Sequence, residues 1–312
     1  YITYLFESMF LVGVNCFVLI TGYFQIDKSF IKASKIIRIL ISMLSYALLF
    51  YVIAVAIGAL PLTLKELGKA LLPFFIDRRW FIEVYIILIL LSPFINIGLN
   101  NCNKKNFRKY LFIMFLFFSI WPSFLPSSPV TDNGYGIITF VMLYSVGAYL
   151  RKFSINLLPK IFYFLGFIMC ASFTFLCSLF LKEVLGIGRI WGYNFIFIIA
   201  ASVFLFIYFS KIHIQSKVII HIAKFTLGVY FVHTDPSIIS ILYKYILHCD
   251  EYWNNSLFLL HAFGSIVLIY ISGTIIDIIK EIAFEIVTKF IIIPIKDYFH
   301  EHTWISNVIN KG

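Results

Sequence analysis

The chain has 312 residues, of which 61% are hydrophobic and only 13% are charged. Soluble domains are about half apolar and about a quarter charged, so this composition excludes that class and predicts an all-α, polytopic transmembrane helix bundle. The net charge of +10 does not indicate nucleic-acid binding, because the basic residues cluster in short gaps between apolar runs. The five cysteines show neither CxxC nor zinc spacing, so neither a disulfide framework nor a metal site is indicated. We also expect no bound cofactor, because the sequence has no Gly-rich phosphate loop.

Nine apolar runs are long enough to predict membrane-spanning helices. Two of them are short, and a loop rich in Pro, Ser and Gly separates these two. The nine predicted helices cover residues 5–24, 38–59, 80–99, 109–124, 136–150, 160–181, 193–210, 218–245 and 256–279.

The basic residues orient this bundle. When Tyr1 is placed outside and the helices alternate, every inside segment is basic, as the positive-inside rule requires. An outside N-terminus suggests that a first helix, entering from the cytoplasm, precedes Tyr1. We therefore expect the chain to lack its natural N-terminus.

A basic face precedes the second predicted helix. Lys28, Lys32, Lys35 and Arg38 recur at spacings of three and four, so they share one side of a helix. Such a face suits anionic lipid headgroups, and it equally suits the phosphates of a nucleotide-bearing substrate. Composition alone favours the lipid interpretation.

Several polar and aromatic residues are predicted at the outer membrane interface. Trp80 and Tyr85 lie at the start of the predicted helix 80–99, with the acidic Glu83 between them. Arg189 lies just before the predicted helix 193–210. An acid there is either paired, for instance with Arg79, or lines an outward cavity. Aromatic and Arg side chains suit sugar recognition, and they also suit an ordinary interfacial belt.

The stretch 222–236, IAKFTLGVYFVHTDP, concentrates ionisable groups in an apolar run. Such groups face a bundle interior or an aqueous cavity, and His changes charge most easily near neutral pH. The helix should kink or end at Pro236, just after His233 and Asp235. Counted from Lys217 along one helix, His233 lies about 24 Å deep, in the outer part of the membrane. A bundle histidine without chemistry is the alternative.

The segment 280–312 is predicted to be a cytoplasmic or interfacial tail. Glu281, Glu285 and Lys289 recur at helical spacing among apolar residues, and Pro294 interrupts the run. We interpret it as a helix that leaves the membrane and then lies along its surface.

Five strings in this chain resemble signatures of the acyltransferase-3 family of integral membrane acyltransferases, in the branch that acylates surface polysaccharides. NCFVLITGYF resembles its second helix, and KIIRIL resembles its basic RxxR motif, with Lys35 in the first Arg place and Arg38 in the second. WFIEVYIILILLSPFIN, YSVGAYLRK and FTLGVYFVH resemble three further signatures. The strings keep the family's order over most of the chain.

The resemblance implies a single membrane-embedded acyltransferase domain, residues 1–312, with ten helices in the complete protein. It implies transfer of an acyl group, usually from acetyl-CoA, to a hydroxyl of a glycan or glycolipid at the bacterial cytoplasmic membrane. The family carries its principal histidine on a first helix that these residues do not include. In this chain Lys35 and Arg38 could hold the CoA phosphates. His233 is not the equivalent of that histidine, and we infer from the residues themselves that His233 and Asp235 orient the acceptor or assist proton transfer.

A second class of function stays open from the sequence. A flippase or exporter of a glycolipid would use Glu83, His233 and Asp235 as a proton relay. Transporters of this kind show internal repeats and paired broken helices, and we find neither pattern in the sequence.

Overall fold

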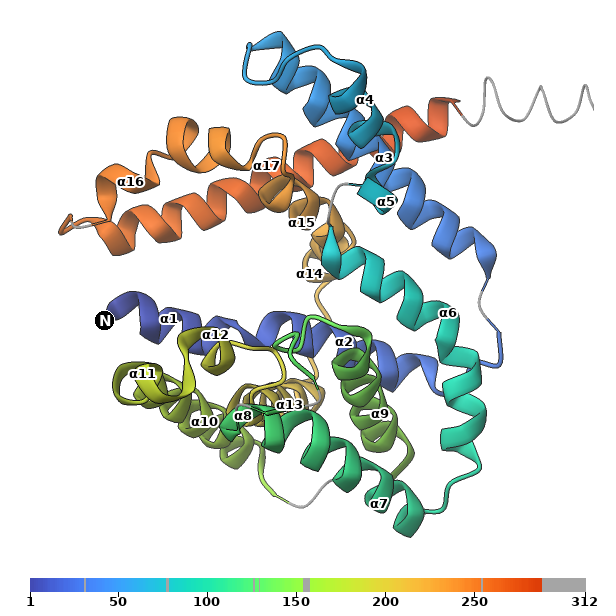
Figure 1. Cartoon of the computed structure of the whole chain (residues 1–312). Coiled ribbons are helices and arrows are strands. Elements are labelled where there is room, and N and C mark those ends of the chain that lie inside the picture. Colours follow the sequence, from blue (N-terminus) through green and yellow to red (C-terminus); the bar gives the residue numbers. More distant parts are fainter. Residues whose placement is uncertain are drawn as a thin grey trace, which may run out of the picture. The chain divides into compact units, whose positions relative to one another are not determined.

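The computed structural model describes residues 1–30, 32–76, 79–125, 127–128, 130–153, 158–253 and 255–287. Within these ranges every regular element is a helix, which confirms the all-α prediction (Figure 1). The contacts divide the chain into two compact units, Tyr1–Ile36 with Trp80–Ile214 and Ile37–Arg79 with Gln215–Gly312. The two are described separately below as the first and second units, and the single domain stays a prediction.

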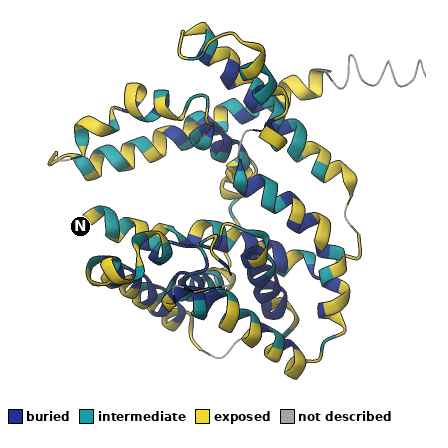
Figure 2. Cartoon of the chain, viewed as in Figure 1, coloured by how far each residue is buried: buried dark blue, intermediate teal, exposed yellow. Residues whose placement is uncertain are grey.

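The first unit is built around four helices, each of which packs against the next. Helix α2 (Val12–Gln25) packs against both α9 (Ile137–Phe153) and α13 (Ile196–Ser210), and α13 packs on α10 (Lys160–Phe180). Figure 2 shows α9 as mostly buried. The other elements are α1 (Ile2–Phe10), α6 (Trp80–Asn100), α7 (Lys104–Phe115), the π-helix η1 (Leu116–Ile120), α8 (Trp121–Phe124), α11 (Lys182–Leu185) and α12 (Ile187–Ile190).

The second unit is built on three helices, α3 (Ala33–Ala56), α15 (Thr226–Thr234) and α17 (Phe258–Val287). The second unit begins at Ile37, so the first four residues of α3 belong to the first unit and the rest of α3 belongs to the second. Helix α15 packs against α17, and hydrogen bonds join α3 to α17. The remaining elements are α4 (Leu64–Leu71), α5 (Pro73–Ile76), α14 (Lys217–Ala223), the π-helix η2 (Ile241–Ile246) and α16 (Cys249–Tyr252).

Five segments of the described chain are long and apolar enough to cross a membrane. They are Ile2–Gln25, Ala33–Ala56, Trp80–Asn100, Lys160–Phe180 and Phe258–Ile286, with Ile196–Ser210 as a shorter apolar helix. Each corresponds to a predicted span. The run 109–124 is divided among the consecutive α7, η1 and α8, and the run 136–150 forms the 17-residue α9, so the count of nine spans stays a prediction.

The predicted helix 218–245 is wrong as one continuous element. A turn at Lys224 and Phe225 separates α14 from α15, and η2 follows after a further break. The depth of about 24 Å assigned to His233 assumed one uninterrupted helix, so that count is also wrong. The predicted end of the helix before Pro236 is confirmed, because α15 stops at Thr234 with Asp235 in extended conformation.

The C-terminal helix runs further than predicted. Helix α17 continues through the predicted boundary at 279 as far as Val287, so residues 280–287 belong to it. The rest of the predicted tail, 288–312, lies outside the described residues.

Two glycines allow α2 and α9 to approach closely. A Cβ at Gly22 would lie 2.0 Å from the carbonyl oxygen of Tyr144, and one at Gly147 would lie 2.1 Å from that of Leu19. Because both obstacles are backbone atoms, neither can move without separating the helices. Small residues serve the same purpose in membrane helix pairs generally.

We expect Gly22→Ala to lower the stability of the folded protein by about 1–3 kcal/mol, the usual range for overpacking. Gly13→Ala is the matched control on the same helix, because nothing lies within 4 Å of a Cβ there. That change should leave the melting temperature unchanged or raise it, since Ala favours helix more than Gly does. Thermal unfolding in detergent measures both variants, and equal melting temperatures would contradict the close packing of α2 and α9.

Candidate functional site

The residues predicted to carry function are distributed over both units. Trp80, Glu83, Tyr85 and Arg189 belong to the first unit, and Arg38, His233 and Asp235 belong to the second. Lys35 and Arg38 are both exposed and lie on the first two turns of α3. Each group is described within its own unit.

In the first unit, Trp80 lies at the centre of an aromatic cluster. Its ring stacks on Tyr193 with centroids 5.5 Å apart and packs against Tyr135 at 4.6 Å. Tyr135 and Tyr193 also contact each other edge to face. The cluster joins the start of α6 to the segments that precede α9 and α13, so residues distant in sequence share one aromatic surface.

The other predicted residues of this unit lie close in sequence to members of this cluster. Glu83 and Tyr85 follow Trp80, and Arg189 precedes Tyr193. Tyr85 packs its ring against Phe17 and Phe81, so its ring faces are occupied by helix packing. Glu83 lies half-buried in the first turn of α6, and Arg189 lies half-buried in α12. The carbonyl of Arg189 accepts a hydrogen bond from Gly192, which holds the turn that leads to Tyr193.

In the second unit, His233 lies near the C-terminal end of α15 with its ring half-buried. Its Nδ1 lies 2.8 Å from the carbonyl oxygen of Val229, one turn earlier. A carbonyl can only accept, so Nδ1 carries the proton and donates. In the neutral ring, Nε2 therefore carries the lone pair and can act as a base. The Tyr230 ring contacts the imidazole edge to face at 5.8 Å.

Asp235, two residues later, forms a buried ion pair with Arg79. The guanidinium Nη2 donates to Oδ2 at 2.5 Å, and the side chains are only 2% and 0% exposed. Arg79 also donates to the carbonyl of Met43 at 3.0 Å and lies over the ring of Phe231. Oδ1 of Asp235 accepts from the Ser237 amide at 2.9 Å. The pair thus fixes the chain where α15 ends.

A second buried network joins α3 to α17. The Tyr46 hydroxyl donates to Oδ1 of Asp277 at 2.7 Å, and Lys280 pairs with the same oxygen at 2.6 Å. Lys280 also contacts Glu281 at 3.2 Å and donates to the Ser42 hydroxyl at 3.2 Å. No role was predicted from the sequence for Tyr46, Asp277 or Lys280. The available signal was Asp277, an acid at the end of a predicted membrane span.

The two networks meet at a pair of aromatic rings. Phe231, which lies under Arg79, stacks on Tyr46 with ring centroids 5.0 Å apart. Gly228 allows α15 to lie this close to Tyr46 and Asp277. A Cβ at position 228 would lie 2.6 Å from the Tyr46 hydroxyl and 2.5 Å from the Asp277 side chain. The end of α15 that carries His233 is therefore held from both sides by buried charged groups.

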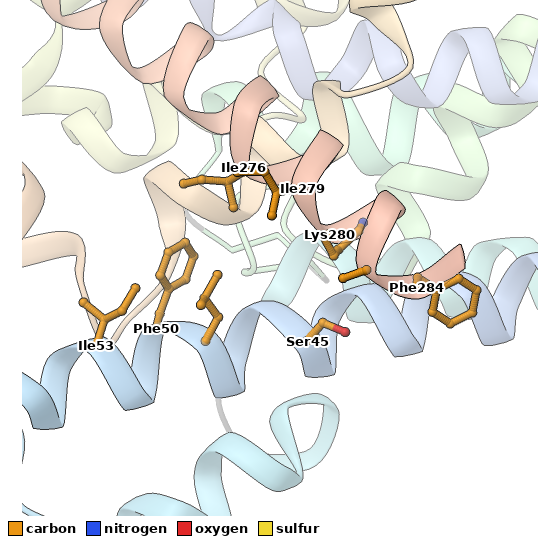
Figure 3. A pocket seen from close by; sticks show the side chains of 9 residues that line it. Ser45, Phe50, Ile53, Ile276, Ile279, Lys280 and Phe284 are labelled. Carbon is orange, nitrogen blue, oxygen red and sulfur yellow. The ribbon is translucent and has the colours of Figure 1, made fainter. Parts of the chain in front are cut away.

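Arg38 is the outermost residue of this second network, which it contacts through Glu281. It forms an ion pair with Glu281, although its side chain stays 68% exposed. Beside it, α3 and α17 enclose a groove of about 650 Å³ whose two walls face each other in Figure 3. Within the described ranges, no group of three His, Cys, Asp or Glu side chains could hold a metal ion.

The comparison with protein families decides the class of this chain. Residues 1–276 match a family model described as an acyltransferase domain, that of acyltransferase-3. The match covers well over half of the chain. The chain belongs to the acyltransferase-3 family. Comparisons with curated proteins and with solved structures found no match.

As a member of the acyltransferase-3 family with apolar, membrane-length helices, the protein is an integral membrane acyltransferase. The matched residues include the aromatic cluster of the first unit, His233 and the Arg79–Asp235 pair. Lys280 and Glu281 follow directly after the matched range. The matched range therefore contains most of the residues whose contacts are described above.

Proposed function

We propose that this membrane acyltransferase moves an acyl group, acetyl in the simplest case, from acyl-CoA to a hydroxyl group. The acceptor is a surface or capsular polysaccharide or its membrane-bound precursor, and the membrane is the bacterial cytoplasmic membrane. The observation that carries the proposal is the fixed His233 tautomer in a chain of this family. An acceptor hydroxyl must lose a proton as it attacks a thioester, and a neutral imidazole nitrogen can take it.

We assign His233 to the acceptor side of the reaction. Its Nε2 orients the acceptor hydroxyl or assists the proton transfer, alongside the principal histidine that the family carries on its first helix. Asp235 is a positioning residue. Its carboxylate binds Arg79 and the Ser237 amide, and these contacts hold the end of α15 that carries His233. The oxyanion that forms on the thioester carbon needs separate donors.

We assign the donor's phosphates to Lys35 and Arg38 on the first two turns of α3. Both side chains are exposed, and guanidinium and ammonium groups are the usual partners of phosphate. The acceptor's sugar rings fit the aromatic surface around Trp80, with Glu83, Tyr85 and Arg189 as the neighbouring residues that select hydroxyl groups. Rings stack on sugars through their apolar faces, and the charged groups provide hydrogen bonds.

The direct test follows labelled acetyl from CoA into glycan. Membranes that contain the protein, expressed from its complete coding sequence, should incorporate the label into polysaccharide in a form that mild alkali releases, as an ester requires. Membranes without the protein provide the background. Glycolipid that crosses the bilayer with no label incorporated would contradict the proposal and would favour the transporter.

The donor assignment predicts the effect of removing one charge. Arg38→Ala and Lys35→Ala should each weaken acyl-CoA binding about tenfold, since a hydrogen bond to a charged group contributes about 1.5–3 kcal/mol. Lys105→Ala is the matched control, because Lys105 is an exposed basic residue on α7. Equilibrium binding to purified protein measures the change. An unchanged affinity in well-folded Arg38→Ala would remove Arg38 from the donor site.

A further inference from the structure

A groove lies between α3 and α17. It measures about 650 Å³, and its walls include Leu49, Phe50, Ile53, Ile276 and Ile279. Ile53 and Ile279, which line the groove in Figure 3, are 41% and 60% exposed, so the groove is open at its surface. Both helices are long and apolar enough to cross a membrane. We therefore expect the open side to face lipid hydrocarbon.

The end of the groove near Arg38 is closed by ion pairs. Lys280 uses its ammonium group on Asp277, Glu281 and Ser42, and Glu281 in turn binds Arg38. The hollow beside these residues measures only about 20 Å³, which is the space of about one water molecule. The structure therefore offers an occupant a lateral route from the bilayer.

The lining of the groove suits a hydrocarbon chain. Its two polar residues are already satisfied, because Ser45 donates to the carbonyl of Ile41 and Lys280 has the three partners above. A polar arm with amide groups, such as pantetheine, would lose hydrogen bonds to water there without regaining them. An alkyl chain loses no hydrogen bonds there, and it gains close van der Waals contacts with the apolar walls.

The rim of the groove carries an exposed basic side chain, that of Arg38. Arg38, Ser42, Ser45, Leu49 and Ile53 follow one another at spacings of three and four, so the rim and the groove lie on the same face of α3. Arg38 commits one guanidinium nitrogen to Glu281 and stays mostly exposed. Lys32 and Lys35 are exposed just before it in the chain. An anionic headgroup fits this end of the groove.

We propose that the groove binds one acyl chain of an anionic phospholipid of the bilayer, with the lipid phosphate at Arg38. The apolar walls hold the chain, and the charge of Arg38 selects the headgroup. This site is separate from the acyl transfer chemistry, although it shares Arg38 with the donor assignment. Lipid binding is therefore measured with no acyl-CoA present.

Native mass spectrometry of the delipidated protein tests the proposal, with dioleoyl phosphatidylglycerol against dioleoyl phosphatidylcholine. The first phosphatidylglycerol should bind at least about fivefold tighter, and Arg38→Gln should abolish that preference, since one basic residue contributes about 1 kcal/mol. Ala283→Phe places a ring in the groove from α17. It should weaken the first site to the level of the later, non-specific lipids, because the ring takes the space of the chain and removes its contacts with the walls.

Matched variants separate this site from general lipid contact. Ile271→Phe changes an exposed residue of α17 outside the groove, and Lys105→Gln removes an exposed charge elsewhere, so both should bind like the unchanged protein. If Ala283→Phe fails to fold, Leu49→Trp fills the same groove from α3. Equal retention of the two lipids, or binding that groove-filling leaves unchanged, would overturn the proposal.

Discussion

Replacing His233 with Gln should lower glycan acylation per folded protein by about a hundredfold, the low end of the range for a lost acid–base group. Gln can still donate a hydrogen bond to the carbonyl of Val229, which the imidazole does through Nδ1. It cannot take up a proton as the imidazole Nε2 can. The measurement is acylated glycan divided by folded protein, in the protein expressed from its complete coding sequence.

The same substitution at a second histidine provides the control. His261 on α17 also bonds a backbone carbonyl, with Nε2 2.6 Å from the oxygen of Leu247, and it stacks on Tyr252. We assign it no role in the reaction, so His261→Gln should keep its activity per folded protein. Acyl-CoA binding should be unchanged in His233→Gln, because the donor's phosphates are assigned to α3. Full activity in His233→Gln would make this residue a scaffold.

Asp235→Ala should destabilise the protein by about 3–5 kcal/mol, the usual cost of breaking a buried ion pair from one side. The variant leaves the charge of Arg79 buried, with both side chains almost fully covered in the intact pair. The Ser237 amide also loses its acceptor at the end of α15. Thermal or denaturant unfolding in detergent measures the loss, and a large drop in expression should accompany it.

The Arg38–Glu281 pair is the matched comparison for that result. Its side chains are 68% and 26% exposed, so Glu281→Ala should cost no more than about 1 kcal/mol. Replacing the buried pair by apolar side chains, as in Arg79→Met with Asp235→Leu, should be less harmful than Asp235→Ala alone. Equal losses for Asp235→Ala and Glu281→Ala would contradict the assignment of Asp235 as the residue that holds the end of α15.

The sequence by itself determined the class of protein and much of the helix order. Long apolar runs with few charges admit only helices, because backbone groups in lipid must be satisfied within one segment. The helices at Ala33–Ala56, Trp80–Asn100 and Lys160–Phe180 match their predicted runs for that reason. Pro236 likewise marked the end of α15, since proline has no amide hydrogen to continue the ladder.

Only the tertiary structure decided which charged groups are partners. Arg79 and Asp235 are 156 residues apart, and Tyr46 and Asp277 are 231 apart. Helical periodicity shows which residues share a face, but it does not show which faces meet, because that depends on packing across several helices. The break at Lys224 also escaped the sequence, since neither proline nor glycine occurs at the turn itself. The networks around His233 and the groove beside Arg38 therefore became visible only when α3, α15 and α17 were placed together.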